Sequence, residues 1–190
     1  KKLCSGSDIG SLEVLIGTAD NDDNLTTIGG TAYKTFTVFE SVTFSGVLHG
    51  SIKTSVNASQ TLTTTAAIAN GKTIDGDGSV AITALHSTLA ADLSGITATG
   101  GRTAAFDGNG TFTGALGTTT VTVADNVTMT AAANKVANKT INKSGSGSDN
   151  GALAVRIGTA DNDDNLTTIA GTAAKTFTVF ESVTFSGVLH

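Results

Sequence analysis

The chain of 190 residues has no proline and no tryptophan, and only one cysteine, one methionine and one tyrosine. The single cysteine, Cys4, excludes a disulfide framework within the chain and a zinc site built on several cysteines. With only two arginines and a net charge of −5, the chain lacks the basic surface that nucleic-acid binding requires. No apolar run approaches the length of about 18 residues that a membrane-spanning helix needs. We therefore expect no nucleic-acid partner and no membrane insertion.

Small and β-branched residues are abundant instead. The chain contains 34 Thr, 25 Ala, 23 Gly and 16 Ser, which together make up about half of it. Threonine, valine and isoleucine favour extended backbone, and the chain is poor in the helix formers Glu and Leu. The composition predicts an all-β protein.

A long internal repeat dominates the sequence. Residues 157–190 match residues 16–49 at an offset of 141, with 32 of 34 positions identical. The two differences are Gly29 against Ala170 and Tyr33 against Ala174. We expect residues 1–49 to be the C-terminal part of one 141-residue repeat and residues 50–190 to be one full repeat. A fragment of a longer tandem array is the simplest explanation of this pattern.

A weaker repeat divides the long one. The motif Thr-Phe-(Ser/Thr)-Gly-x-Leu occurs at residues 43–48, 111–116 and 184–189, with offsets of 68 and 73. We therefore divide the full repeat into sub-units of about 70 residues, at about 50–117 and 118–190. Duplication at two levels is typical of an elongated repeat protein.

Apolar and polar residues alternate with a period of two. Val121 and Val123, for example, alternate with Thr120 and Thr122, as expected for a strand with one buried and one exposed face. The same alternation occurs at Phe36 and Val38, at Val80 and Ile82, and at Val127 and Met129. Clusters of Gly, Asp and Asn between these strands predict turns.

Two all-β architectures fit these short strands. A β-solenoid with three coils of roughly 23 residues per sub-unit suits the small apolar residues and the absence of proline, because each strand donates hydrogen bonds to its neighbours along the stack. Tandem immunoglobulin-like β-sandwiches are the alternative, although such domains usually bury tryptophan or bulky aromatic residues. We predict the solenoid.

Two segments carry a resemblance to a known class of protein. GKTIDGDGSVAIT at 71–83 and AADLSGITAT at 90–99 resemble the tandem units of giant repeat-rich bacterial surface proteins, namely β-strand-repeat adhesins and surface filament or surface-layer proteins. The resemblance implies secretion, a β-rich rod on the cell surface and a structural or adhesive role. It supplies no catalytic residues.

Calcium is the one cofactor that the sequence suggests. Carboxylate and amide oxygens closely spaced in a loop are the ligands that Ca²⁺ prefers, and such a loop occurs once in each copy of the repeat. The Gly and the distal Glu of an EF-hand are missing, so turn formation is the competing interpretation. The candidate ligands are Asp20, Asp22, Asp23, Asn24, Asp161, Asp163, Asp164 and Asn165.

From these observations we expect no enzymatic activity, because the chain has no recognisable catalytic motif. We expect a structural segment of a secreted cell-surface fibre that self-associates through β-strand stacking. The alternative is a calcium-stabilised spacer or adhesive region of a large adhesin, with a cell surface or glycan as partner. The Thr-x-Thr pairs leave ice binding as a third interpretation, although their spacing is irregular.

Overall fold

Parallel β-strands form most of this computed structural model, which describes residues 10–145 and 150–190. The fourteen strands in this part of the chain are β1 (Ser11–Ile16), β2 (Tyr33–Val38), β3 (Val42–Phe44), β4 (Thr54–Val56), β5 (Thr61–Thr65), β6 (Ile74–Gly76), β7 (Ser79–Thr83), β8 (Gly101–Phe106), β9 (Gly110–Phe112), β10 (Thr120–Val123), β11 (Thr128–Ala132), β12 (Ile141–Lys143), β13 (Ala152–Ile157) and β14 (Ala174–Val179). The short helices between them are α1 (Ala66–Ala69), α2 (Ala133–Val136) and the 3-10 turns η1 (Thr18–Asp20), η2 (Leu25–Thr27), η3 (Leu85–Ser87), η4 (Thr159–Asp161) and η5 (Leu166–Thr168). None of the helices in the described residues is long and apolar enough to cross a membrane.

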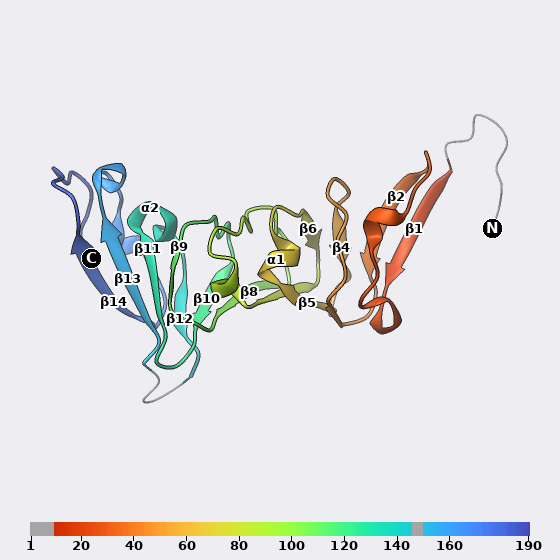
Figure 1. Cartoon of the computed structure of the whole chain (residues 1–190), viewed down its shortest axis with the longest axis horizontal. Coiled ribbons are helices and arrows are strands. Elements are labelled where there is room, and N and C mark those ends of the chain that lie inside the picture. Colours follow the sequence, from red (N-terminus) through yellow and green to blue (C-terminus); the bar gives the residue numbers. More distant parts are fainter. Residues whose placement is uncertain (1–9, 146–149) are drawn as a thin grey trace.

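The strands form three sheets that follow one another along the long axis of the molecule (Figure 1). Their strand orders are β1-β2-β4-β6, β12-β10-β8-β7-β5-β3 and β14-β13-β11-β9. We call the chain between a strand and its next partner in the same sheet a coil. Coils range from 17 residues, between Ala104 and Val121, to 24 residues, between Ala131 and Val155.

Every ladder between the described strands is parallel. The prediction of an all-β protein is therefore confirmed. The alternative prediction of immunoglobulin-like sandwiches is wrong for the described residues, because those sandwiches are built from antiparallel sheets.

The expected alternation produces one continuous apolar core. In β10 the side chains of Val121 and Val123 are fully buried, while Thr120 and Thr122 are half-buried. The core extends from the first copy of the repeat to the second and consists mainly of Val, Ile, Leu and Ala. Its largest members are Phe36, Phe44, Phe106 and Phe112.

The glycine of the Thr-Phe-(Ser/Thr)-Gly-x-Leu motif allows neighbouring coils to approach closely. A Cβ built on Gly46 would lie 2.1 Å from the carbonyl oxygen of Asp23 in the preceding coil. Gly114 and Gly187 meet carbonyl oxygens of their own preceding coils at 2.0 and 2.1 Å. Since any side chain would clash there, the motif marks the points where backbone packs directly on backbone.

Equivalent strands of the repeat lie in different sheets. β1 and β2 belong to the sheet of β4 and β6, whereas β13 and β14 belong to the sheet of β9 and β11. At the shorter offset, β5 lies in the six-stranded sheet and β11 in the third sheet. Equivalent strands of the two copies therefore have different neighbouring strands.

Candidate functional site

The acidic loop of the first copy folds into two 3-10 turns. At the end of η1, Asp20 accepts a hydrogen bond at Oδ2 from the backbone N–H of Gly17 at 3.0 Å. Asn24 precedes η2 and accepts at Oδ1 from the backbone N–H of Thr26 at 3.1 Å and from its hydroxyl at 2.6 Å. Both side chains therefore satisfy donors at the start of a turn.

The acidic loop of the second copy adds one contact to this arrangement. Asp161 is buried and accepts from the backbone N–H of Gly158 at 2.8 Å. Its other oxygen accepts from the N–H of Asn134 at 2.9 Å, which joins η4 to α2 in the preceding coil. Asn165 accepts from the N–H of Thr167 at 3.1 Å. The loop thus links two coils in addition to forming a turn.

The other carboxylates of the two loops are less engaged. Asp22, Asp23 and Asp163 are exposed, while Asp164 is half-buried and its Oδ2 is enclosed without a hydrogen-bond partner. Burial raises the pKa of Asp164, and the negative charges of Asp161 and Asp163 raise it further.

Within the described residues, no group of three or more His, Cys, Asp and Glu side chains is placed to hold a metal ion. Four of the eight predicted calcium ligands serve as turn caps, so calcium binding by these loops stays a prediction. The four are Asp20, Asn24, Asp161 and Asn165.

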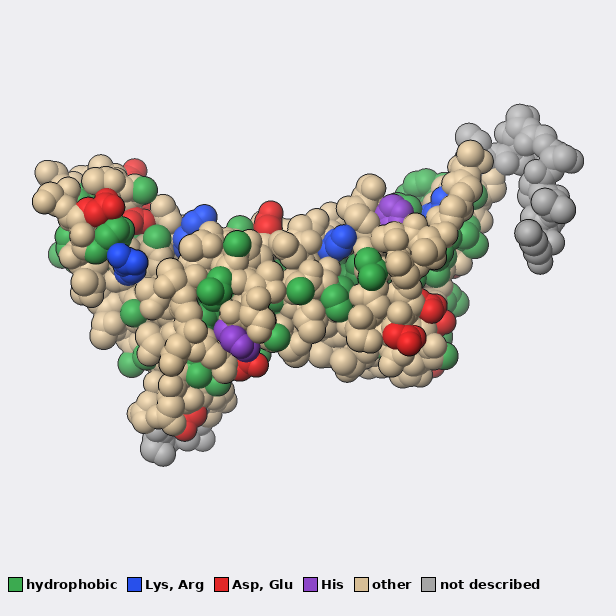
Figure 2. Space-filling model, viewed as in Figure 1, with side chains coloured by type: hydrophobic (Ala, Val, Ile, Leu, Met, Phe, Trp, Pro, Cys, Tyr) green, Lys and Arg blue, Asp and Glu red, His purple; other side chains and the backbone are tan. Residues whose placement is uncertain are grey.

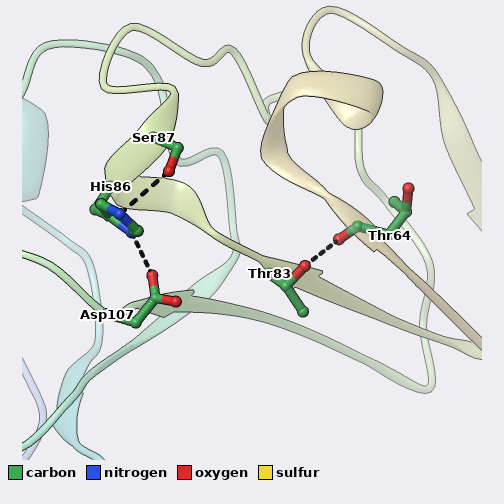
Figure 3. A network of polar contacts seen from close by, with 5 residues as sticks. All are labelled: Thr64, Thr83, His86, Ser87 and Asp107. Carbon is green, nitrogen blue, oxygen red and sulfur yellow. Dashed lines mark hydrogen bonds and ion pairs between the residues drawn. The ribbon is translucent and has the colours of Figure 1, made fainter. Parts of the chain in front are cut away.

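A histidine–aspartate pair forms a polar network outside the acidic loops (Figure 3). His86 in η3 contacts Oδ1 of Asp107, which follows β8, through Nδ1 at 2.5 Å. The hydroxyl of Ser87 lies 3.1 Å from Nε2 of the same ring. Serine, histidine and aspartate are the residue types of a hydrolytic triad. Here His86 and Asp107 come from adjacent coils, and the ring of His86 also packs against Gly108. We interpret this network as a clamp, by which we mean a side-chain contact that holds two adjacent coils together.

A second clamp joins Lys53 to Asp75. Their side chains form an ion pair at 2.6 Å, and this contact raises the pKa of Lys53. The two residues are 22 positions apart, and the His86–Asp107 pair is separated by 21. The sequence reasoning missed both pairs, because the coil length that brings their side chains together varies along the chain.

A groove with a volume of about 780 Å³ lies on the sheet of β1, β2 and β4. Tyr33 on its wall is 64% exposed, and the lining also includes Glu13, Phe36, Thr37 and Lys53. Figure 2 shows charged side chains scattered over a surface that is mostly uncharged. The groove beside Tyr33 combines an aromatic ring with charges of both signs.

The chain matches no family model, no curated protein and no solved structure.

Proposed function

We propose that this chain is a structural segment of a secreted cell-surface fibre. In this proposal the three sheets form a β-solenoid rod, and the rod self-associates through β-strand stacking. Its task is mechanical: the backbone hydrogen bonds between coils and the core beneath them resist extension and lateral collapse.

The main support for this proposal is the succession of parallel, in-register β-ladders along the molecule. The partners of Val80 illustrate it, because they are Leu62 on one side and Arg102 on the other. Each coil therefore needs the next one to satisfy its backbone and to cover its apolar residues, an arrangement that lengthens by addition of coils. The resemblance of residues 71–83 and 90–99 to bacterial surface proteins supports a location outside the cell.

Electron microscopy of the purified protein tests this proposal. We expect rods whose axial spacing equals that of stacked strands, about 4.8 Å. Globular particles without this spacing would refute the rod and the structural role with it.

The groove beside Tyr33 favours one alternative function, an adhesive region that binds a cell-surface glycan. An exposed aromatic ring flanked by carboxylate, ammonium and hydroxyl groups can stack on a sugar and hydrogen-bond to it. Tyr33→Ala introduces the residue that the second copy has at position 174, so it should abolish glycan binding without unfolding the chain. Glycan-array binding that is unchanged by this substitution would contradict the alternative.

The calcium-stabilised spacer is tested by chelation. If the acidic loops hold Ca²⁺, removing it with a chelator should lower the midpoint of thermal unfolding. The double substitution of Asp22→Asn and Asp163→Asn, one in each loop, should abolish the difference. Ice binding receives little support, because the ladder partners of Thr128 and Thr130 are Ala152 and Ala154, which interrupts a flat threonine array.

A further inference from the structure

The third sheet carries a small pocket whose charged side chains are both basic. The pocket has a volume of about 130 Å³ and is lined by residues of β9, β11, α2 and β13, which lie side by side (Figure 1). Lys135 of α2 and Arg156 of β13 line it, and no carboxylate is among the lining residues. In a chain with a net charge of −5, two cations facing one pocket favour an anionic ligand.

The fold itself does not use these two cations as ion-pair partners. In the part of the chain that the structure describes, neither the Lys135 ammonium nor the Arg156 guanidinium forms an ion pair or a hydrogen bond. Lys139, by contrast, donates to the carbonyl oxygen of Gly117 at 2.5 Å. Because Lys135 is half-buried, its charge has lost part of its hydration without gaining a partner, and an anion in the pocket would supply one.

Stacking on an aromatic ring positions Arg156. Its guanidinium carbon lies 4.2 Å from the centroid of the Phe180 ring. This contact covers one face of the planar group and leaves the N–H groups in its plane free to donate. Phe180 is 44% exposed, and its counterpart Phe39 is 40% exposed although the chain continues from there into β3 and β4. The exposure of this ring therefore does not depend on whether another coil follows.

The rest of the lining is small and hydroxylic. Ala132 is the ladder partner of Arg156, and its single methyl group leaves room beside the guanidinium. Thr111 and Thr113 are exposed and line the same pocket. A hydroxyl group both donates and accepts hydrogen bonds, which suits the hydroxyl groups of a sugar.

The strands beneath the pocket have no free edge. β11 pairs with both β9 and β13, and β13 pairs with both β11 and β14. A peptide therefore cannot bind here by adding a strand, and a ligand is held by side chains. This arrangement favours a sugar over a peptide as the carrier of the anionic group.

We propose that this pocket binds the carboxylate of an acidic sugar residue in a polysaccharide outside the cell. The forked N–H donors of Arg156 match the two oxygens of a carboxylate, and Lys135 supplies a second positive charge. The counterpart of Arg156 in the first copy is Leu15, so the first copy lacks this cation. The site is separate from the groove beside Tyr33, and the choice of a polysaccharide rests on the proposed location outside the cell.

Isothermal titration calorimetry with three probes tests this site. The probes are tetragalacturonic acid, its methyl ester and a tetraglutamate peptide. Arg156→Leu introduces the residue of the first copy, and Lys135→Gln removes the second cation. Lys72→Gln is the matched control, because it removes one positive charge from a residue outside the lining. Circular dichroism checks that each variant keeps its β-structure, and Lys135→Gln carries the test if Arg156→Leu does not fold.

The parent chain should bind tetragalacturonic acid at least about 10-fold more tightly than the methyl ester, because esterification removes the negative charges. Arg156→Leu and Lys135→Gln should each weaken binding of the acid by at least about 10-fold, since each removes a charge-assisted hydrogen bond. Lys72→Gln should change it by no more than about twofold at physiological salt. No binding of the acid, equal binding of the ester or an equal loss in Lys72→Gln would overturn the inference.

Two further outcomes separate this inference from its neighbours. Equal or tighter binding of tetraglutamate would indicate an acidic protein partner and refute the polysaccharide. Loss of binding in Tyr33→Ala but not in Arg156→Leu would place the sugar in the groove beside Tyr33 and refute the site. Rods in the microscope that bind no acidic sugar would leave the proposed function standing, whereas globular particles that bind it would leave the pocket and remove the rod.

Discussion

Leu48 and Leu189 allow the stabilisation due to coil stacking to be measured within one chain. They occupy equivalent positions in identical sequence surroundings, yet Leu48 is buried and Leu189 is exposed. Truncating a buried leucine to alanine removes its contacts and leaves a cavity, at a cost of about 2–5 kcal/mol. Leu48→Ala should therefore lower the free energy of unfolding by this amount. Leu189→Ala should lower it by no more than about 0.5 kcal/mol.

Urea unfolding followed by circular dichroism measures both values. The protein concentration is kept below the range in which the parent chain associates. Equal losses for the two variants would refute the reasoning, because they would show that the difference in burial between Leu48 and Leu189 does not determine the cost of truncation. A larger loss for Leu189→Ala would contradict it equally.

Three further predictions concern the turns and clamps. Gly76 and Gly30 have φ of +99° and +95°, but of the two only Gly76 would place a Cβ in a clash with the preceding coil. Gly76→Ala should therefore lower the free energy of unfolding, measured by thermal unfolding, by at least about 2 kcal/mol more than Gly30→Ala does. Similar losses for the two variants would argue against close packing of the coils at Gly76. Asp107→Ala breaks the exposed contact to His86 and should cost at most about 1 kcal/mol in urea unfolding; a larger loss would mean that the clamp does more than join two coils. Since the pKa of Asp164 is raised, folded stability falls as pH increases through the interval between its unfolded and folded pKa values. Asp164→Asn should therefore raise the free energy of unfolding at neutral pH, but not at a pH below the pKa that Asp164 has in the unfolded chain. A gain in stability that does not vary with pH would refute the explanation by the raised pKa.

The local structure was predictable because it depends on neighbours in the sequence. The alternation at Val121 and Val123 predicted a strand with one buried face, and the structure confirms it. The motif that contains Gly46 was recognisable from its recurrence, and each of its glycines lies in close contact with the preceding coil. Both features can be recognised in the sequence from the two-residue periodicity of a strand and from the size of each side chain.

The arrangement between coils was not predictable in the same way. His86 and Asp107 meet only because one coil happens to contain about 21 residues there, and coil length varies along the chain. The acidic loops show a related difficulty, because oxygen atoms suited to calcium are equally suited to capping backbone N–H groups. Asp161 illustrates this, since its second oxygen accepts from Asn134 in another coil.

The mismatch between repeat and coil also bears on function. Since the two copies lie in different sheets, a residue that recurs every 141 positions has different neighbouring strands in each copy. A flat recognition surface, such as an ice-binding face, needs the same residues in register on neighbouring strands of one sheet, and this repeat does not place them there. A recognition site in this chain is therefore expected at a position where the two copies differ. Tyr33 is such a position, because the second copy has Ala174 there, and the exposed Tyr33 side chain lines a groove.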